Sequence, residues 1–121
     1  MVNYEDLLSI PYEDGGRDPK KGLDCYGLLL ELCRRNGKPL KDIYSKGRVK
    51  GERLPDLKET VNIMPIDKHS VKYGDVMYCL VDHNLHVGFM LDNKTVLHMT
   101  DRGARLTPCL CFVNPQFCKV I

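Results

Sequence analysis

The sequence predicts an α+β fold, in which N-terminal helices pack on an antiparallel sheet formed by the second half of the chain. Two observations predict it. Apolar side chains recur at helical spacing after residue 24, whereas short apolar runs separated by polar turns follow from residue 75 onward. Because the helical part precedes the strands and does not alternate with them, a segregated α+β arrangement is favoured. The length of 121 residues fits a single domain, residues 1–121.

The first third of the chain predicts a short helix, a loop and a longer helix. Tyr4–Ser9 is a short amphipathic stretch, and residues 10–22 are dense in Gly and Pro, which predicts a loop. A helix is expected from Cys25 to about Arg35, because Asp24 is a good N-cap and Asn36-Gly37 is a stop signal. Its apolar stripe consists of Cys25, Leu28, Leu29, Leu32 and Cys33.

The middle of the chain carries weaker signals. Residues 37–54 show no clear periodicity, and Pro55–Asn62 predicts a short helix with its proline near the start. Whether residues 37–70 cover a binding groove as a lid does not follow from their composition.

From Tyr73 onward, apolar runs alternate with polar turns and predict an antiparallel meander. The expected strands are Asp75–Val81, Leu85–Leu91, Thr95–Thr100, Ala104–Thr107 and Phe117–Ile121.

The loop Asp92-Asn93-Lys94 decides which side chains share a face. If it is a three-residue hairpin loop, Leu91 pairs with Thr95, His86 faces Thr100, and His98 lies on the same face as His86. A two-residue loop would place His98 on the opposite face.

Composition excludes several classes of protein. Hydrophobic residues make up 43% and charged residues 28%, as in ordinary globular proteins. The net charge of +2 is too small to indicate nucleic-acid binding, and no Lys/Arg cluster is interleaved with aromatic residues. No apolar run approaches the roughly 20 residues of a membrane span, and the first residues lack the features of a signal peptide. We expect a chain made in the cytoplasm, without a membrane span or a nucleic-acid partner.

Six cysteines are expected to be reduced: Cys25, Cys33, Cys79, Cys109, Cys111 and Cys118. An even number suggests disulfides in a secreted chain, but no export signal is present, and a free Cys25 would leave an odd number. Cys33 lies in a helical stripe and Cys79 in an apolar run, as buried thiols do. The Cys-x-Cys pair at 109–111 lacks the second half of a zinc site, so no metal is expected.

Cys25 is a candidate nucleophile, because the first turn of a helix favours a thiolate. Such positions lower a thiol pKa from about 8.5 into the range of about 3.5–7.5. The alternative is a small buried side chain at the start of a core helix. A nucleophile needs a base and an orienting group. His69 and His83 lie in polar connections and are expected to be solvated, whereas His86 and His98 lie within strands, with or without a function.

Several motifs occur in the order and at the spacing of a known peptidase family. They are Pro11-Tyr12-x-x-Gly15-Gly16-x-x-Pro19-x-x-Gly22-x-Asp24-Cys25-x-Gly27-Leu28, Gly74-Asp75-Val76, His86-Val87-Gly88 and Leu97-His98. With them, the chain resembles the NlpC family of papain-like cysteine peptidases over nearly its whole length. Tyr26, where family members commonly carry serine, and the run Gly16-Arg17-Asp18-Pro19 look more like the subgroup of phage tail-assembly and tail-tip proteins.

The resemblance implies a role for each candidate residue. Cys25 attacks the scissile carbonyl, His86 is the base, and His98 orients the His86 ring. Tyr12 donates its hydroxyl to the oxyanion beside the Cys25 backbone N–H; the alternative is a packing residue only. Asp24 is the helix cap and a candidate anchor for an amino group of the substrate.

The resemblance also implies an activity and a setting. The activity is hydrolysis of peptidoglycan stem peptides, usually at the amide between γ-D-glutamate and the diamino acid, without a cofactor. The setting is a phage or prophage tail, with tail proteins as further partners and the cell wall as the site of action. The alternatives are an inactive structural tail protein on the same fold, and an N-acetylmuramoyl amidase or acyltransferase that uses the same Cys–His site.

Overall fold

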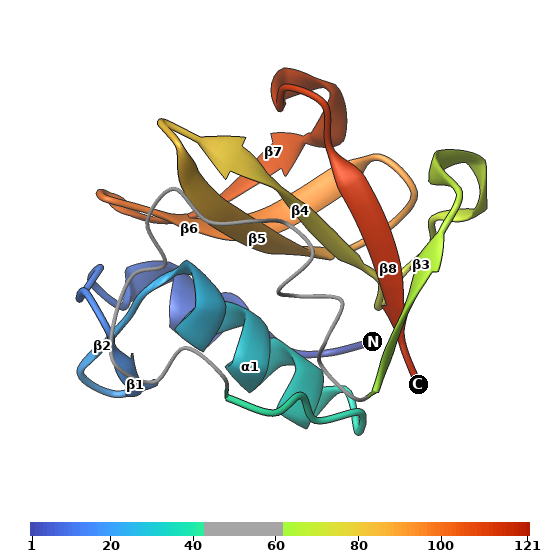
Figure 1. The fold of residues 1–121 in the computed structure, drawn as a ribbon. Helices are drawn as coiled ribbons and strands as arrows, with labels where there is room; N and C mark the ends of the chain where they lie inside the picture. The colour runs from blue at the N-terminus through green and yellow to red at the C-terminus, as the bar shows by residue number, and fades with distance from the viewer. Residues whose placement is uncertain (43–61) are drawn as a thin grey trace.

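The N-terminal part of the chain forms a helical layer against one face of a sheet (Figure 1). The structure is a computed structural model that describes residues 1–42 and 62–121. The helical layer contains a 3₁₀ helix at Glu5–Ser9 (η1) and the α-helix Cys25–Arg35 (α1), which contacts the sheet mainly along strand β5. Both helices lie where the sequence predicts them.

Helix α1 has the predicted bounds because local chemistry sets both ends. The Asp24 carboxylate accepts a hydrogen bond from the Gly27 N–H at 2.7 Å, and such a cap contributes about 1 kcal/mol. At the other end, the Asn36 N–H donates to the Leu32 carbonyl at 2.9 Å, and Gly37 has a φ of +80°, which favours glycine. The helix is buried more widely than its stripe predicts, since Glu31 is also buried, where it pairs with two arginines.

The predicted loop over residues 10–22 is wrong in one respect, because it contains a short hairpin. Strand β1 (Arg17–Asp18) pairs with β2 (Gly22–Leu23). The glycines of this segment permit close backbone packing: a Cβ built on Gly16 would lie only 2.5 Å from the Gly22 carbonyl oxygen. The high glycine content of this segment therefore indicates a tightly packed hairpin as well as a turn.

Within the described residues, six strands form one antiparallel sheet with the order β3-β8-β4-β5-β6-β7. Strands β4 to β7 form the predicted meander, and β8 returns to the other side of β4, next to β3 (Figure 1). The bounds are β3 Ile63–Ile66, β4 Val76–Val81, β5 Asn84–Met90, β6 Thr95–Thr100, β7 Gly103–Pro108 and β8 Gln116–Val120. Two further 3₁₀ turns, η2 and η3, span Lys68–Ser70 and Cys109–Cys111.

The predicted strands are all present, with ends shifted by one residue at most, but β3 was not predicted. Its sequence contains Pro65, which an edge strand tolerates because one side of its backbone needs no partner. Residues 37–42 form neither helix nor strand, as expected. The helix predicted over 55–62, except for its last residue, lies outside the described residues, as does most of the segment considered as a lid.

The hairpin between β5 and β6 has the three-residue loop. Phe89 pairs with Leu97, and the Leu91 N–H donates to the Thr95 carbonyl at 2.9 Å. The Asp92 carboxylate sets the loop length, since it accepts from the N–H groups of Lys94 and Thr95, both at 2.7 Å. The register confirms the prediction that His86 and His98 share one face.

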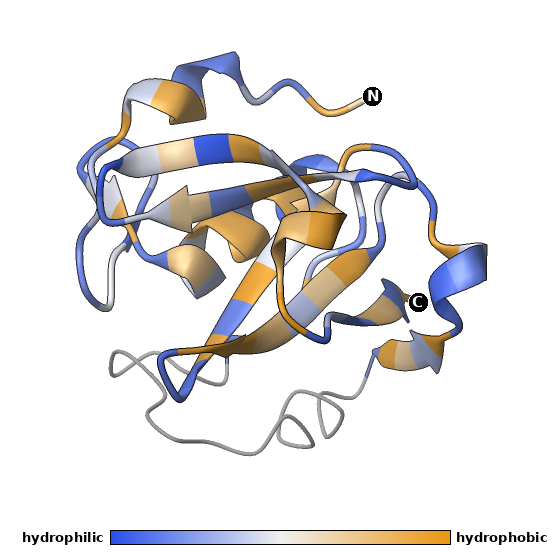
Figure 2. Cartoon of the chain, turned by 90° about the horizontal axis from the view of Figure 1, so that it is seen from above, coloured by the Kyte–Doolittle hydropathy of each residue, from blue (hydrophilic) through white to orange (hydrophobic). Residues whose placement is uncertain are grey.

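Two apolar clusters cover the two faces of the sheet. The first lies under α1 and includes Leu28, Leu32 and Phe89; the second lies on the other face and includes Met77 and Met90. Hydrophobic residues accordingly run through α1 and much of the sheet (Figure 2). In the ranges 1–42 and 62–121, no helix combines the length and the apolar character that crossing a membrane would require.

Candidate active site

The residues singled out in the sequence meet in one pocket. The pocket has a volume of about 460 Å³ and lies where the N-terminus of α1 meets the β4–β5 and β6–β7 turns. Its lining includes all the predicted site residues, Tyr12, Asp24, Cys25, His86 and His98. They come from three separate parts of the chain, so their meeting depends on the fold.

Cys25 is the first residue of α1 and is half-buried. Its Sγ lies 4.0 Å from the carbonyl oxygen of Leu85, the residue before His86 in β5. The thiol therefore sits at the positive end of the helix dipole, at the start of the strand that carries the histidine. Two other thiols differ sharply: burial raises the pKa of Cys33 to about 12 and that of Cys79 to about 11, so both stay protonated at neutral pH.

The two strand histidines are hydrogen-bonded to each other. His86 Nε2 lies 2.9 Å from His98 Nδ1, and the rings are nearly perpendicular at 88°. His98 is 7% exposed, and burial, with the nearby charge of Arg105, lowers its pKa. The neutral form of the His98 ring is therefore favoured at neutral pH. Because Nε2 of His86 is used in this bond, Nδ1 is the ring nitrogen of His86 that does not contact His98.

Phe112 forms an aromatic wall beside the histidines that sequence reasoning missed. Its ring stacks on His86 with centroids 5.9 Å apart and meets the edge of His98 at 5.0 Å. Phe112 therefore packs against both histidine rings. The only sequence signal is an apolar residue after the last strand of the meander, and that gives no hint of a contact with β5.

Asp24 is the centre of a charged network as well as a helix cap. Its buried carboxylate accepts from the Gly15 N–H at 3.1 Å and from Arg17 Nη1 at 2.6 Å. Arg17 also binds Asp42 through Nε at 2.8 Å. Although burial alone would lower the pKa of Arg17, the two carboxylates raise it. The cap role is confirmed, whereas the substrate-anchor role stays a prediction and would compete with these donors.

Tyr26, the departure from the usual motif, has a structural role in this network. Its ring lies under the Arg17 guanidinium at 5.7 Å, and its hydroxyl donates to the Lys41 carbonyl at 2.6 Å. Tyr26 therefore ties the chain after α1 to the helix N-terminus.

Tyr12 has both a packing contact and a polar one. Its backbone forms an isolated bridge with Leu23, and its ring packs against the core cluster under α1. Its hydroxyl donates to Asp14 Oδ1 at 3.4 Å, a long bond that a substrate oxygen could replace. Packing and oxyanion binding are thus compatible at this position.

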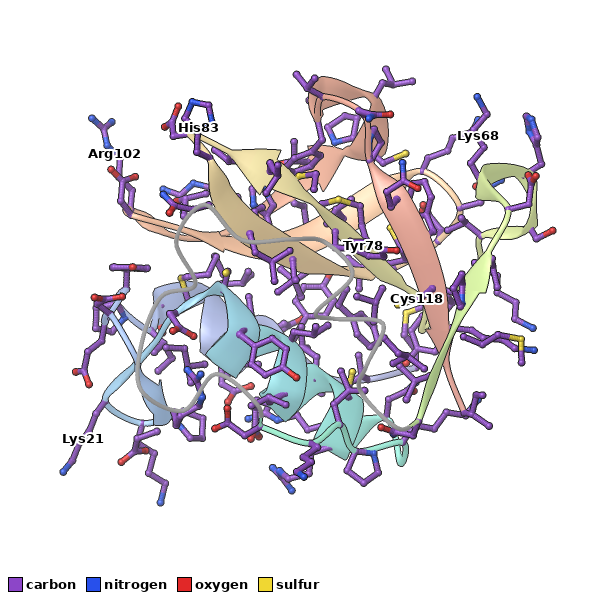
Figure 3. All side chains as sticks on the ribbon, viewed as in Figure 1. Lys21, Lys68, Tyr78, His83, Arg102 and Cys118 are labelled. Atoms are coloured by element: carbon purple, nitrogen blue, oxygen red, sulfur yellow. The ribbon has the colours of Figure 1, made fainter. Side chains whose placement is uncertain are left out.

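His69 and His83 are exposed and do not line the pocket, as the sequence predicts. His83 occupies the tip of the β4–β5 hairpin and points away from the body of the protein (Figure 3). Its φ of +64° reflects the tight two-residue turn there. In the part of the chain that the structure describes, no three His, Cys, Asp or Glu side chains are grouped so that they could hold a metal ion.

Comparisons with known proteins identify the family and the fold of the chain. The family model described as NlpC/P60 matches residues 9–110. Among solved structures, the NlpC/p60 domain of the peptidoglycan hydrolase SagA superposes with a TM-score of 0.61 at 19% identity, covering 98% of this chain and 92% of that one. None of the curated proteins matches in sequence. The structural likeness confirms the α+β, papain-like NlpC fold. Because the family match spans most of its 121 residues, the chain belongs to the NlpC/P60 family.

Proposed function

We propose that this protein is a cysteine peptidase that hydrolyses peptidoglycan stem peptides, with residues 1–121 as one catalytic domain. The observation that carries the proposal is the His86–His98 hydrogen bond of 2.9 Å in the pocket that Cys25 also lines. A thiol at a helix N-terminus with an oriented imidazole is the arrangement that thiol hydrolases need. The family membership, and the description of SagA as a peptidoglycan hydrolase, support the polymer as substrate.

The mechanism begins with proton transfer from Cys25 to His86. The Sγ proton moves to His86 Nδ1, while the Nε2–H donates to His98, so that a thiolate–imidazolium pair forms. The thiolate attacks the scissile amide carbonyl, and a tetrahedral oxyanion develops. His86 then gives the Nδ1 proton to the leaving amine, the C–N bond breaks, and a thioester on Cys25 remains. Water, deprotonated by His86, attacks the thioester, the C–S bond breaks, and the peptide is released as its carboxylic acid. The proton held on His86 returns to the Cys25 thiolate, which restores the free thiol.

Tyr12 and the backbone of Cys25 stabilise the oxyanion in this mechanism. The Tyr12 hydroxyl and the Cys25 N–H both donate to the carbonyl oxygen as it gains charge. Asp24 is assigned to an amino group of the substrate, in competition with Arg17. Chemistry at this site requires no cofactor.

Tyr12→Phe tests the oxyanion assignment. Loss of one oxyanion donor lowers kcat by about 10²–10³-fold, so we expect a fall of this size with KM little changed. Tyr4→Phe is the matched control, because Tyr4 also packs on the core but does not line the pocket. Full kcat in the Tyr12→Phe variant would leave Tyr12 as a packing residue only.

The bond that is cleaved is proposed to be the amide between γ-D-glutamate and the diamino acid. The test is mass spectrometry of purified muropeptides after incubation with the protein, with a Cys25→Ala sample as the blank. Cleavage at this amide supports the proposal. Release of intact stem peptide from the sugar would indicate an N-acetylmuramoyl amidase, and transfer of the acyl group to another acceptor an acyltransferase. Intact muropeptides would favour an inactive structural protein.

The proposed setting is a phage or prophage tail, where the protein would act on the cell wall and bind other tail proteins. Its support is the sequence alone, namely Tyr26 and the Gly16-Arg17-Asp18-Pro19 run. The setting predicts that the chain is found by mass spectrometry in purified phage particles, and its absence from them would contradict the tail assignment without affecting the peptidase assignment.

A further inference from the structure

A third polar group extends the histidine pair away from the pocket. His98 Nε2 lies 2.8 Å from Oγ1 of Thr107. Thr107 belongs to the neighbouring strand β7, where it pairs with Val96, and it is half-buried. It does not line the pocket. The hydrogen bonds therefore run in one chain from His86 through His98 to Thr107.

The positions of the protons in this chain decide whether His86 can act as a base. A neutral imidazole carries one N–H and one acceptor nitrogen. If His98 is protonated at Nε2, it donates to Thr107, its Nδ1 accepts from His86 Nε2–H, and His86 Nδ1 is the acceptor for the thiol proton. If Thr107 instead donates to His98, the His98 proton lies on Nδ1 and is donated to His86 Nε2. His86 then already carries its proton on Nδ1 and cannot take another from Cys25.

We propose that Thr107 is a positioning residue, whose hydroxyl oxygen accepts the Nε2–H of His98 and thereby keeps His86 in the tautomer that serves as base. The inference rests on the proposed function and adds a fourth group to its site. Thr107 acts only through His98, to which it is hydrogen-bonded, since Thr107 itself does not line the pocket.

The surroundings of His98 support a neutral ring in this role. Arg105 pairs with His98 across β6 and β7, the ring of Phe112 meets its edge, and His86 lies on its Nδ1 side. Burial and the Arg105 charge lower the pKa of His98. A doubly protonated His98, which could not accept from His86, is therefore disfavoured at neutral pH. The neutral His98 ring carries one proton, either on Nδ1 or on Nε2, and Thr107 is the group in contact with Nε2.

The experiment compares Thr107→Val, which keeps the shape but removes the hydroxyl, with Thr107→Ser, which keeps the hydroxyl. We expect Thr107→Val to lower kcat by about 3- to 10-fold, the value of one neutral hydrogen bond, with KM unchanged. Thr107→Ser should retain most of the activity. Thr95→Val is the matched control, because Thr95 lies in the β5–β6 hairpin and bonds only weakly, at 3.4 Å, to Asp92 through its hydroxyl.

Nitrogen-15 NMR of the histidine rings gives a readout that does not depend on cleavage. The wild-type spectrum should show His98 protonated at Nε2, and Thr107→Val should change that signal. Protonation of wild-type His98 at Nδ1, equal kcat in Thr107→Val and wild type, or equal losses in the Val and Ser variants would each overturn the inference. If the wild-type protein cleaves no muropeptide, the proposed function fails. The inference is then decided by NMR and by the rate of Cys25 alkylation, which Thr107→Val should lower and Thr107→Ser should not.

Discussion

Cys25→Ala is expected to abolish cleavage of stem peptides and to leave the fold intact. The side chain supplies the atom that forms the thioester, and removal of the nucleophile from a hydrolase triad lowers kcat on the order of 10⁶-fold. Cys25 is only half-buried at the first turn of α1, so replacing it by alanine, a good helix former, should not disturb the core. The measurement is muropeptide turnover by mass spectrometry, together with a circular dichroism melt of each protein.

Cys111→Ser is the control for this substitution. Cys111 is exposed in η3 and does not line the pocket, so its replacement should leave turnover unchanged. If Cys25→Ala cleaved muropeptides at nearly the wild-type rate, a group other than Cys25 would be the nucleophile.

His86→Ala has the second large expected effect, and His83→Ala provides the comparison. The two residues lie three positions apart, but His86 lines the pocket and bonds to His98, whereas His83 is exposed at the hairpin tip. Loss of the base should lower kcat nearly as much as loss of the nucleophile, on the order of 10⁶-fold, because the groups of a triad act as one unit. His83→Ala should change turnover little. Equal losses in both variants would show that His86 was wrongly chosen as the base.

The parts of the fold that could be predicted are those set by local chemistry. The ends of α1 follow from the Asp24 cap and Gly37, and the register of β5 and β6 follows from the Asp92 turn. Strand β3 could not be predicted, because its sequence lacks alternation and its stability comes from pairing with β8, far along the chain. The residues of β3 alone carry no signal of a partner strand so distant in the sequence.

The candidate site likewise contains residues that the sequence could reveal and residues that it could not. Cys25 and His86 could be found because each has a recognisable position, at a helix start and within a strand, and the motif spacing relates them. Phe112 and Thr107 could not, since each owes its place beside the histidines to contacts between separate strands and turns. Asp24 was recognised as a cap, but its ion pair with Arg17, which also binds Asp42, depends on how the β1–β2 hairpin folds back onto α1.

The central claim is that the Cys25 sulfur is held as a thiolate by the helix terminus and by His86. The most direct measurement is the rate of iodoacetamide labelling of each cysteine, mapped by mass spectrometry from about pH 5 to about pH 9, because only the thiolate reacts. We expect Cys25 to be labelled at about pH 6 much faster than the exposed Cys111, and this advantage to be largely lost in His86→Ala. Cys25 labelling that is no faster than that of Cys111 at about pH 6, and that rises only toward the ordinary thiol pKa of about 8.5, would contradict the account.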